Sequence, residues 1–172
     1  MISKQNIDKA KLVKLVVTDI DGVWTDSKMY YSDKGLYMKA FSTYDGMAAT
    51  LLQKYNFILA MVTSEYENIA ILQNRADKLQ IKELYFNEHN KLNRVKKIAD
   101  KYKLEKNNIA YIGDDLNDLN VLKYVGLSVS PKNAPILNYF KPDFITSREG
   151  GSGAFRDLVD LLFKAQNISP KY

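Results

Sequence analysis

Short apolar runs alternate along this chain with longer stretches in which apolar residues recur every three or four positions. The runs Lys14–Asp19 (KLVVTD), Phe57–Val62 (FILAMV) and Asn108–Ile112 (NIAYI) are nearly continuous in apolar residues. Such runs are typical of strands buried on both faces of a sheet. Shorter strands are predicted at Leu84–Phe86, Leu127–Val129 and Phe144–Ile145.

Helical periodicity fills the segments between these strands. It predicts helices at Tyr44–Tyr55, Glu65–Leu79, Asn90–Lys103, Asp115–Tyr124 and Ala154–Ala165, and a short helix at Pro135–Phe140. Strands that alternate with helices indicate an α/β fold, in which helices flank both faces of a central parallel sheet. We expect residues 1–172 to form a single domain of this kind.

Two segments fall outside the alternation. Met29–Tyr31 and Leu36–Phe41 read as short strands around the turn Ser32–Gly35, which predicts a small β-hairpin flap. Ser147–Gly153 (SREGGSG) is predicted to be a glycine-rich loop.

Composition narrows the possible chemistry. The chain has 172 residues, of which 46% are hydrophobic and 26% charged, and it has no cysteine, which excludes disulfides, thiolate zinc sites and cysteine nucleophiles. The polar N-terminal segment lacks the apolar core of a signal peptide, and no apolar run approaches the roughly 20 residues that span a bilayer. We therefore expect a cytoplasmic protein without a membrane partner. The pattern leaves open whether the first ten residues are ordered.

The formal net charge of +5 comes from lysines spread along the chain, and no nucleic-acid-binding motif accompanies them. No nucleic-acid partner is expected. The charge is consistent with a solvated basic surface or with attraction of an anionic substrate.

Acidic clusters follow two of the predicted strands. Asp19-Ile20-Asp21-Gly22 comes directly after KLVVT, and Gly113–Asp118 (GDDLND) comes directly after NIAYI. Ligands of open parallel sheets bind beyond the carboxyl ends of the strands, so these carboxylates should converge. Either cluster alone could be a turn or a helix N-terminus with acidic caps. Together they indicate a site for Mg²⁺, which prefers oxygen ligands and relieves repulsion between carboxylates.

The clusters also resemble the motifs of the haloacid dehalogenase superfamily of phosphatases. Asp19–Gly22 with Val23 is similar to the first motif, Thr63 to the second, Lys91 to the third and Gly113–Asp118 to the fourth. The resemblance implies the Rossmann-like fold of that superfamily and a magnesium-dependent phosphatase activity.

It further implies roles for individual residues. Asp19 would attack phosphorus and become an aspartyl phosphate. Asp21 would protonate the leaving oxygen and then activate water. Thr63, the amide of Ser64 and Lys91 would bind the phosphoryl oxygens.

The same resemblance implies a metal shell. Asp19, the carbonyl of Asp21 and Asp114 would hold Mg²⁺. Asp115 and Asp118 would support this shell.

The spacing of the motifs leaves no room for a cap domain. Several segments are similar to a capless subfamily that contains 3-deoxy-D-manno-octulosonate 8-phosphate phosphatases and relatives acting on nine-carbon keto sugar acids. These segments are DIDGVWTD (Asp19–Asp26), Asp45-Gly46, Arg75-Ala76, GDDLNDL (Gly113–Leu119) and REGGSGAFRD (Arg148–Asp157). The resemblance implies a homotetramer in which neighbouring subunits complete each active site. It also implies a role in the cytoplasmic synthesis of a cell-envelope glycan such as lipopolysaccharide.

Two positions depart from the octulosonate pattern. Tyr44 stands where an arginine is usual before Asp-Gly, and Thr63-Ser64-Glu65 stands where Thr-Gly-Arg is usual. An acidic residue at this place, with Lys78 further on, is more similar to the nine-carbon relatives, which act on nonulosonate 9-phosphates. Candidates for substrate binding are Ser64, Glu65, Arg75, Lys78 and Arg148. Two alternatives stay open: a capless phosphatase for another sugar phosphate, or a catalytically weak regulatory domain associated with an acylneuraminate cytidylyltransferase.

Overall fold

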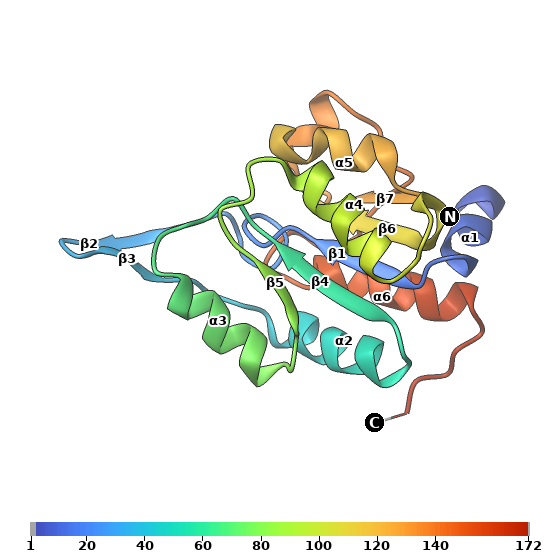
Figure 1. Ribbon diagram of the computed structural model, residues 1–172, viewed down its shortest axis with the longest axis horizontal. Helices are drawn as coiled ribbons and strands as arrows, with labels where there is room; N and C mark the ends of the chain where they lie inside the picture. The colour runs from blue at the N-terminus through green and yellow to red at the C-terminus, as the bar shows by residue number, and fades with distance from the viewer. Residues whose placement is uncertain (1–2, 172) are drawn as a thin grey trace.

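A six-stranded parallel sheet runs through the middle of the molecule (Figure 1). The computed structural model describes residues 3–171. Every neighbouring pair in the sheet is parallel, in the order β5-β4-β1-β6-β7-β8. The strands are β1 (Leu15–Thr18), β4 (Ile58–Val62), β5 (Glu83–Tyr85), β6 (Ile109–Ile112), β7 (Leu127–Ser130) and β8 (Phe144–Ile145).

The continuous apolar runs are explained by burial on both faces of the sheet. Successive side chains of a strand point to opposite faces. In β1, Val16 belongs to one core cluster, whereas Leu15 and Val17 belong to the other. Side chains on both faces must therefore be apolar. The strand sequence is then continuously apolar and lacks the alternation of apolar and polar residues that marks a half-exposed strand.

Two layers of helices cover the sheet, as the two core clusters and Figure 1 show. One layer contains α1 (Lys4–Lys11), α2 (Thr43–Lys54), α3 (Ile69–Lys78) and α6 (Ala154–Ala165). The other contains α4 (Lys91–Lys101) and α5 (Leu119–Tyr124), and short 3₁₀ turns occupy Lys106–Asn108, Leu116–Asp118 and Pro135–Asn138. The predicted α/β fold with a central parallel sheet is confirmed.

The predicted hairpin is also present. It consists of β2 (Tyr30–Ser32) and β3 (Gly35–Met38), which pair antiparallel and project away from the sheet (Figure 1). Between the first and second motifs the chain forms this hairpin, α2 and the sheet strand β4, and between the second and third it forms α3 and β5. Within residues 3–171, neither segment contains a cap domain.

Residues 4–11 of the N-terminal segment form a helix, which the sequence pattern left open, and residues 1 and 2 lie outside the described part of the chain. Helix α1 begins after Ser3, whose Oγ accepts a hydrogen bond from the amide of Asn6 at 3.1 Å. Ala10 is fully buried in the core cluster that includes α6. This helix has only two positions in contact with the core, Ile7 and Ala10, so its apolar periodicity is weak.

The prediction of a helix over Glu65–Leu79 was wrong at its start, because α3 begins only at Ile69. The Glu65 carboxylate accepts hydrogen bonds from the amides of Tyr66 and Glu67 at 2.8 and 2.9 Å. Asn68 then adopts a left-handed conformation with φ of 40°. A side chain that bonds nearby amides competes with the helix, and here it holds a loop instead.

The predicted helix Asp115–Tyr124 is divided in two. Leu116–Asp118 forms a 3₁₀ turn, and α5 follows it. Asp118 turns its carboxylate back onto the amides of Asp114 and Asp115, which tightens this first turn.

In the part of the chain that the structure describes, no helix is both long enough and apolar enough to cross a membrane.

Candidate active site

The register of the sheet brings the motif residues to one edge. Thr18 at the end of β1 lies beside Met61 of β4 and beside Ile112 of β6. The residues that follow these strands therefore reach the same edge. An open pocket of about 590 Å³ lies here, lined by Asp19, Asp21, Ser27, Met29, Thr63, Ser64, Glu65, Asp114, Asp115, Leu116 and Asn117.

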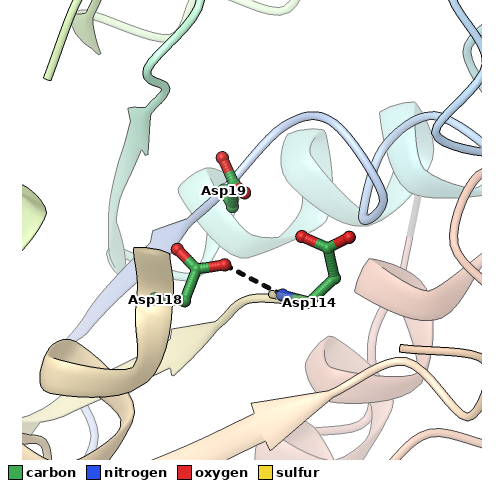
Figure 2. A group of neighbouring side chains, drawn as sticks. All are labelled: Asp19, Asp114 and Asp118. Carbon is green, nitrogen blue, oxygen red and sulfur yellow. Dashed lines mark hydrogen bonds between the residues drawn. The ribbon is translucent and has the colours of Figure 1, made fainter. Parts of the chain in front are cut away.

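Three buried carboxylates meet behind this pocket. Asp19, Asp114 and Asp118 each offer an oxygen that lies within 4.8 Å of the others (Figure 2). Burial, and then the Asp118 carboxylate, raise the pKa of Asp114 to about 7. The same two causes raise the pKa of Asp19, and the Lys91 ammonium opposes them. These shifts show that the cluster carries more negative charge than its surroundings stabilise.

Lys91 at the start of α4 partly neutralises the cluster. Its Nζ lies 2.9 Å from Asp19 Oδ1 and 2.7 Å from Asp118 Oδ1. Burial alone would lower the pKa of Lys91, but these two carboxylates more than offset it and raise the pKa. Lys91 is therefore a permanent ammonium beside the predicted nucleophile.

Asp118 is held more tightly than its two neighbours. Its Oδ1 accepts hydrogen bonds from Lys91 and from the Tyr111 hydroxyl at 2.5 Å, and its Oδ2 accepts the amide of Asp114 at 2.9 Å. With both oxygens engaged, Asp118 fixes Lys91 and the Asp114 backbone. Asp19 and Asp114 are the carboxylates better placed to bind a cation directly.

The donor set of this cluster fits Mg²⁺. It consists of carboxylate oxygens, the ligands that this hard cation prefers. A divalent cation would also offset the burial and the repulsion between carboxylates that raise the pKa values of Asp19 and Asp114. Asp115 lines the pocket, but its Oδ1 accepts a hydrogen bond from the amide of Leu116 at 2.7 Å, so this residue lies at the rim of the cluster.

Gly22 allows the two acidic motifs to approach each other. Its φ of +85° is a conformation that favours glycine. A Cβ at this position would lie 1.9 Å from Asp114 Oδ2. The glycine of the first motif therefore makes room for a carboxylate of the fourth.

Asp21 lies on the turn after β1 and lines the pocket from the hairpin side. Its Oδ1 lies 2.6 Å from the Nζ of Lys39, the residue that follows β3. Its side chain is 22% exposed, which leaves it accessible from the pocket. The backbone of this turn is anchored by Trp24, whose Nε1 donates to Thr18 Oγ1 at 3.0 Å.

Thr63 and Ser64 form the opposite wall at the end of β4. The amide of Thr63 donates to the carbonyl of Tyr85, and the Thr63 hydroxyl accepts the amide of Glu65 at 3.0 Å. The Ser64 hydroxyl donates to the carbonyl of Glu88 at 3.1 Å. Both residues line the pocket together with Asp19.

Three of the predicted substrate-binding residues do not line the pocket of this chain. Arg75 donates to the carbonyl of Ser42 at 3.2 Å, and its guanidinium lies 5.4 Å from the centre of the Phe41 ring. Lys78 lines a separate hollow near the end of α3. Arg148 forms an ion pair of 3.1 Å with Asp157.

The glycine-rich loop packs behind the first motif of its own chain. The amide of Gly151 donates to the carbonyl of Val23 at 2.9 Å. A Cβ on Gly150 would lie 1.9 Å from the carbonyl oxygen of Gly22. Trp24 stacks on Phe155 of α6 with 4.6 Å between ring centres. The loop and α6 together support the turn that carries Asp21.

Sequence reasoning missed Lys39 and Tyr111. Lys39 follows an exposed hairpin strand, and its sequence neighbours give no sign that it is buried. Tyr111 carries the one hydroxyl within the apolar run of β6, and a buried tyrosine hydroxyl usually needs a partner. That rule could have linked Tyr111 to the acidic cluster that follows it.

Comparison with known proteins agrees with this geometry. A family model described as haloacid dehalogenase-like hydrolase matches residues 25–147. The 3-deoxy-D-manno-octulosonate 8-phosphate phosphatase KdsC of Salmonella typhi is 34% identical over 165 residues, which cover 96% of this chain and 87% of that protein. The chain belongs to the haloacid dehalogenase-like hydrolases. The resemblance drawn from its motifs is thereby confirmed.

Solved structures of this hydrolase family have the same fold. The 3-deoxy-D-manno-octulosonate 8-phosphate phosphatase of Yersinia pestis has a TM-score of 0.92 at 32% identity, covering 97% of this chain and 89% of that one. The enzyme of the same name from Moraxella catarrhalis, solved in complex with magnesium, phosphate and KDO, has a TM-score of 0.89 at 34% identity. Its match covers 95% of this chain and 92% of that one.

Proposed function

We propose that this hydrolase is a magnesium-dependent phosphatase that removes the phosphate of a 2-keto-3-deoxy sugar acid through an aspartyl phosphate on Asp19. The observation that carries the proposal is the Asp19 carboxylate, which lies at the end of β1 beside Lys91 and Asp114 and lines an open pocket. The named relatives at 34% identity support the substrate class.

The reaction divides into two steps at this site. In the first, a carboxylate oxygen of Asp19 attacks phosphorus, the bond from phosphorus to the leaving oxygen breaks, and Asp21 gives its proton to that oxygen. In the second, Asp21 takes a proton from water, the resulting hydroxide attacks phosphorus, and the bond to Asp19 breaks. Inorganic phosphate leaves, and both carboxyl groups return to their initial states.

The other residues of the pocket orient and stabilise the phosphoryl group. Lys91 keeps one carboxylate oxygen of Asp19 fixed at 2.9 Å, which directs the other toward the substrate. Thr63 and Ser64 line the pocket, which supports the proposal that the Thr63 hydroxyl and the Ser64 amide donate to phosphoryl oxygens. Asp19 and Asp114, with the Asp21 carbonyl, would hold Mg²⁺. When bound, this cation supplies charge stabilisation for an anionic nucleophile that approaches an anionic phosphate.

The named relatives favour 3-deoxy-D-manno-octulosonate 8-phosphate as the substrate. Glu65, an acidic residue where the octulosonate pattern has arginine, and Lys78 are more similar to the nine-carbon relatives and favour a nonulosonate 9-phosphate. Both are 2-keto-3-deoxy acids whose phosphate lies at the far end of the carbon chain. The proposal therefore covers both, and the first experiment decides between them.

We extend the proposal to assembly and location. The hairpin carries exposed apolar side chains, and Arg75, Lys78 and Arg148 lie outside the pocket of their own chain. Both features support a homotetramer in which a neighbouring subunit closes the site and supplies groups for the substrate carboxylate. A cytoplasmic role in cell-envelope glycan synthesis follows from the proposed substrate class.

The test compares the two sugar acid phosphates as substrates with Mg²⁺, using phosphate release to measure kcat/KM. Asp19→Asn keeps the shape of the side chain and removes the nucleophile, so turnover should fall by more than about a thousandfold. Asp100→Asn, an exposed carboxylate on α4, is the matched control and should leave kcat/KM unchanged. Turnover of other phosphate esters only, still dependent on Asp19, would contradict the sugar-acid assignment. Absence of any Asp19-dependent turnover would favour the regulatory domain.

A further inference from the structure

Lys39 is a fully buried ammonium group at the base of the hairpin. Its side chain is 0% exposed, although Met38 before it is 45% exposed. Taking an ammonium out of water is unfavourable unless carboxylates compensate, and a buried ion pair is weak evidence for a purely stabilising role. Its position beside the pocket suggests a role in the reaction.

Two carboxylates meet this ammonium. Asp21 Oδ1 lies 2.6 Å from Lys39 Nζ, and Glu65 Oε2 lies 3.3 Å from it. The three groups come from three elements: the turn after β1, the end of the hairpin and the loop after β4. Lys39 therefore ties the hairpin to both walls of the pocket.

Glu65 is itself fixed. Its second oxygen, Oε1, accepts the amides of Tyr66 and Glu67 at 2.8 and 2.9 Å, and its side chain is only 8% exposed. Because these two amides fix Oε1, Glu65 presents Oε2 to Lys39 in a defined orientation.

Asp21 depends on Lys39 for its orientation. The other side-chain contact of Oδ1 is the Thr25 hydroxyl at 3.4 Å, which is a weak hydrogen bond. Within residues 3–171, Asp21 Oδ2 has no hydrogen-bond partner, and Asp21 lines the pocket. Fixing Oδ1 thus leaves Oδ2 as the oxygen that can exchange a proton with the leaving group and with water.

We infer that Lys39 is a positioning residue that orients the Asp21 carboxyl group for proton transfer, and that Glu65 holds Lys39 in place for this role. This inference rests on the proposed function, since it assigns a support to the acid–base group of that reaction. It makes the return strand of the hairpin a part of the catalytic apparatus.

The test exploits the fact that good leaving groups need no proton. An alkyl phosphate, such as the sugar acid phosphate, leaves as an alcohol that Asp21 must protonate, whereas 2,4-dinitrophenyl phosphate leaves as a stable anion. For Lys39→Met, kcat/KM for the alkyl phosphate should fall about a hundredfold, within the range of general acid catalysis. For the dinitrophenyl ester, kcat/KM should change less than about threefold. A pre-steady-state burst of dinitrophenol should also appear, because the second step loses its oriented base.

Two further variants sharpen the test. For Glu65→Gln, kcat/KM should fall for the alkyl phosphate and stay nearly unchanged for the dinitrophenyl ester. The fall should be smaller than in Lys39→Met. An effect confined to the KM of the sugar acid, with no dependence on the leaving group, would overturn the supporting role of Glu65. Lys101→Met removes a lysine that pairs with the buried Glu83 away from the pocket, and it should leave both kcat/KM values unchanged.

The outcomes separate this inference from the proposed function. Equal losses of kcat/KM on both esters in Lys39→Met, with the wild type active, would overturn the positioning role. The same holds if Lys39→Met is fully active. If Lys39→Met does not fold, Glu65→Gln decides, because equal losses on both esters there also overturn the inference. A wild type without Asp19-dependent turnover would contradict the proposed function itself.

Discussion

At the scale of single residues, Lys91 is the group whose removal should cost the most stability. It is the cation between Asp19 and Asp118, and all three side chains are almost fully buried. Lys91→Met leaves the two carboxylates beside each other without a counter-charge. Without Mg²⁺, the free energy of unfolding should fall by about 3–5 kcal/mol. Mg²⁺ should restore part of it, because it binds only the folded site.

Urea unfolding with EDTA and with Mg²⁺ measures this effect. Lys97→Met, an exposed lysine on the same helix, is the control and should change the unfolding free energy by less than about 0.5 kcal/mol. A loss below about 1 kcal/mol in Lys91→Met would mean that the carboxylates of the metal-free protein do not need this ammonium.

Asp114 should make both stability and metal binding depend on pH. Its pKa is about 7 in the folded protein and near 3.8 in an unfolded chain. Because the folded pKa is raised, the folded protein holds the proton more tightly, and the stability from this group is lost as pH rises from about 4 to about 7. Mg²⁺ requires the ionised carboxylate, so its affinity should fall by up to about tenfold per pH unit below pH 7.

Thermal melting and calorimetric titration of Mg²⁺ at pH 6 and pH 8 test this prediction. The metal-free melting temperature should be lower at pH 8, and the increase caused by Mg²⁺ should be larger there. In Asp114→Asn, the pH dependence of the metal-free melting temperature should shrink. An unchanged pH profile in this variant would assign the effect to another carboxylate.

At the scale of elements, the glycine-rich loop should be sensitive to one added methyl group. The Cβ of an alanine at position 150 would meet the Gly22 carbonyl oxygen at 1.9 Å, so the loop or the turn that carries Asp21 must shift. Overpacking of this kind costs about 1–3 kcal/mol. Gly150→Ala should therefore lower the melting temperature and kcat/KM together. Ser152→Ala in the same loop is exposed and should change neither.

The elements that sequence reasoning predicted well are those whose pattern depends only on burial. The runs around Val16, Leu59 and Ala110 must be apolar because both faces of each strand are covered. The element boundaries depend on individual side-chain contacts. The Glu65 carboxylate delays the start of α3, and the Asp118 carboxylate tightens the turn before α5. Periodicity contains no information about such contacts.

At the scale of the whole molecule, the sequence likewise predicts the parts of the site that follow from the sheet, and it does not predict those that depend on individual side-chain contacts. Asp19 and Asp114 could be predicted to meet, because Asp19 directly follows one strand of the parallel sheet and Asp114 follows the neighbouring strand after one glycine. The sequence could not show that the Lys39 side chain, at the end of the hairpin, contacts Asp21. The hairpin and the turn after β1 share no hydrophobic pattern that would predict this contact. Nor could the sequence show that Arg75 and Lys78 lie outside the pocket of their own chain.

The hairpin should control assembly if the proposed tetramer is correct. Tyr31 and Tyr37 expose 59% and 69% of their surface on an element that projects away from the sheet (Figure 1). Apolar surface presented in this way is typical of a protein–protein contact. Replacing both tyrosines with serine should convert the tetramer to smaller species, as measured by light scattering after size exclusion.

The activity of the dissociated variant then tests whether a neighbour completes the pocket. If it does, kcat/KM for the sugar acid phosphate should fall on dissociation, while kcat/KM for a small aryl phosphate, which has no carboxylate chain to bind, should fall much less. Tyr139→Ser is the matched control, because Tyr139 is 68% exposed outside the hairpin and should alter neither assembly nor activity. A variant that dissociates and keeps full activity on the sugar acid would show that one chain holds the whole substrate site. The groups that bind the substrate carboxylate would then lie among the residues that line the pocket beside Asp21.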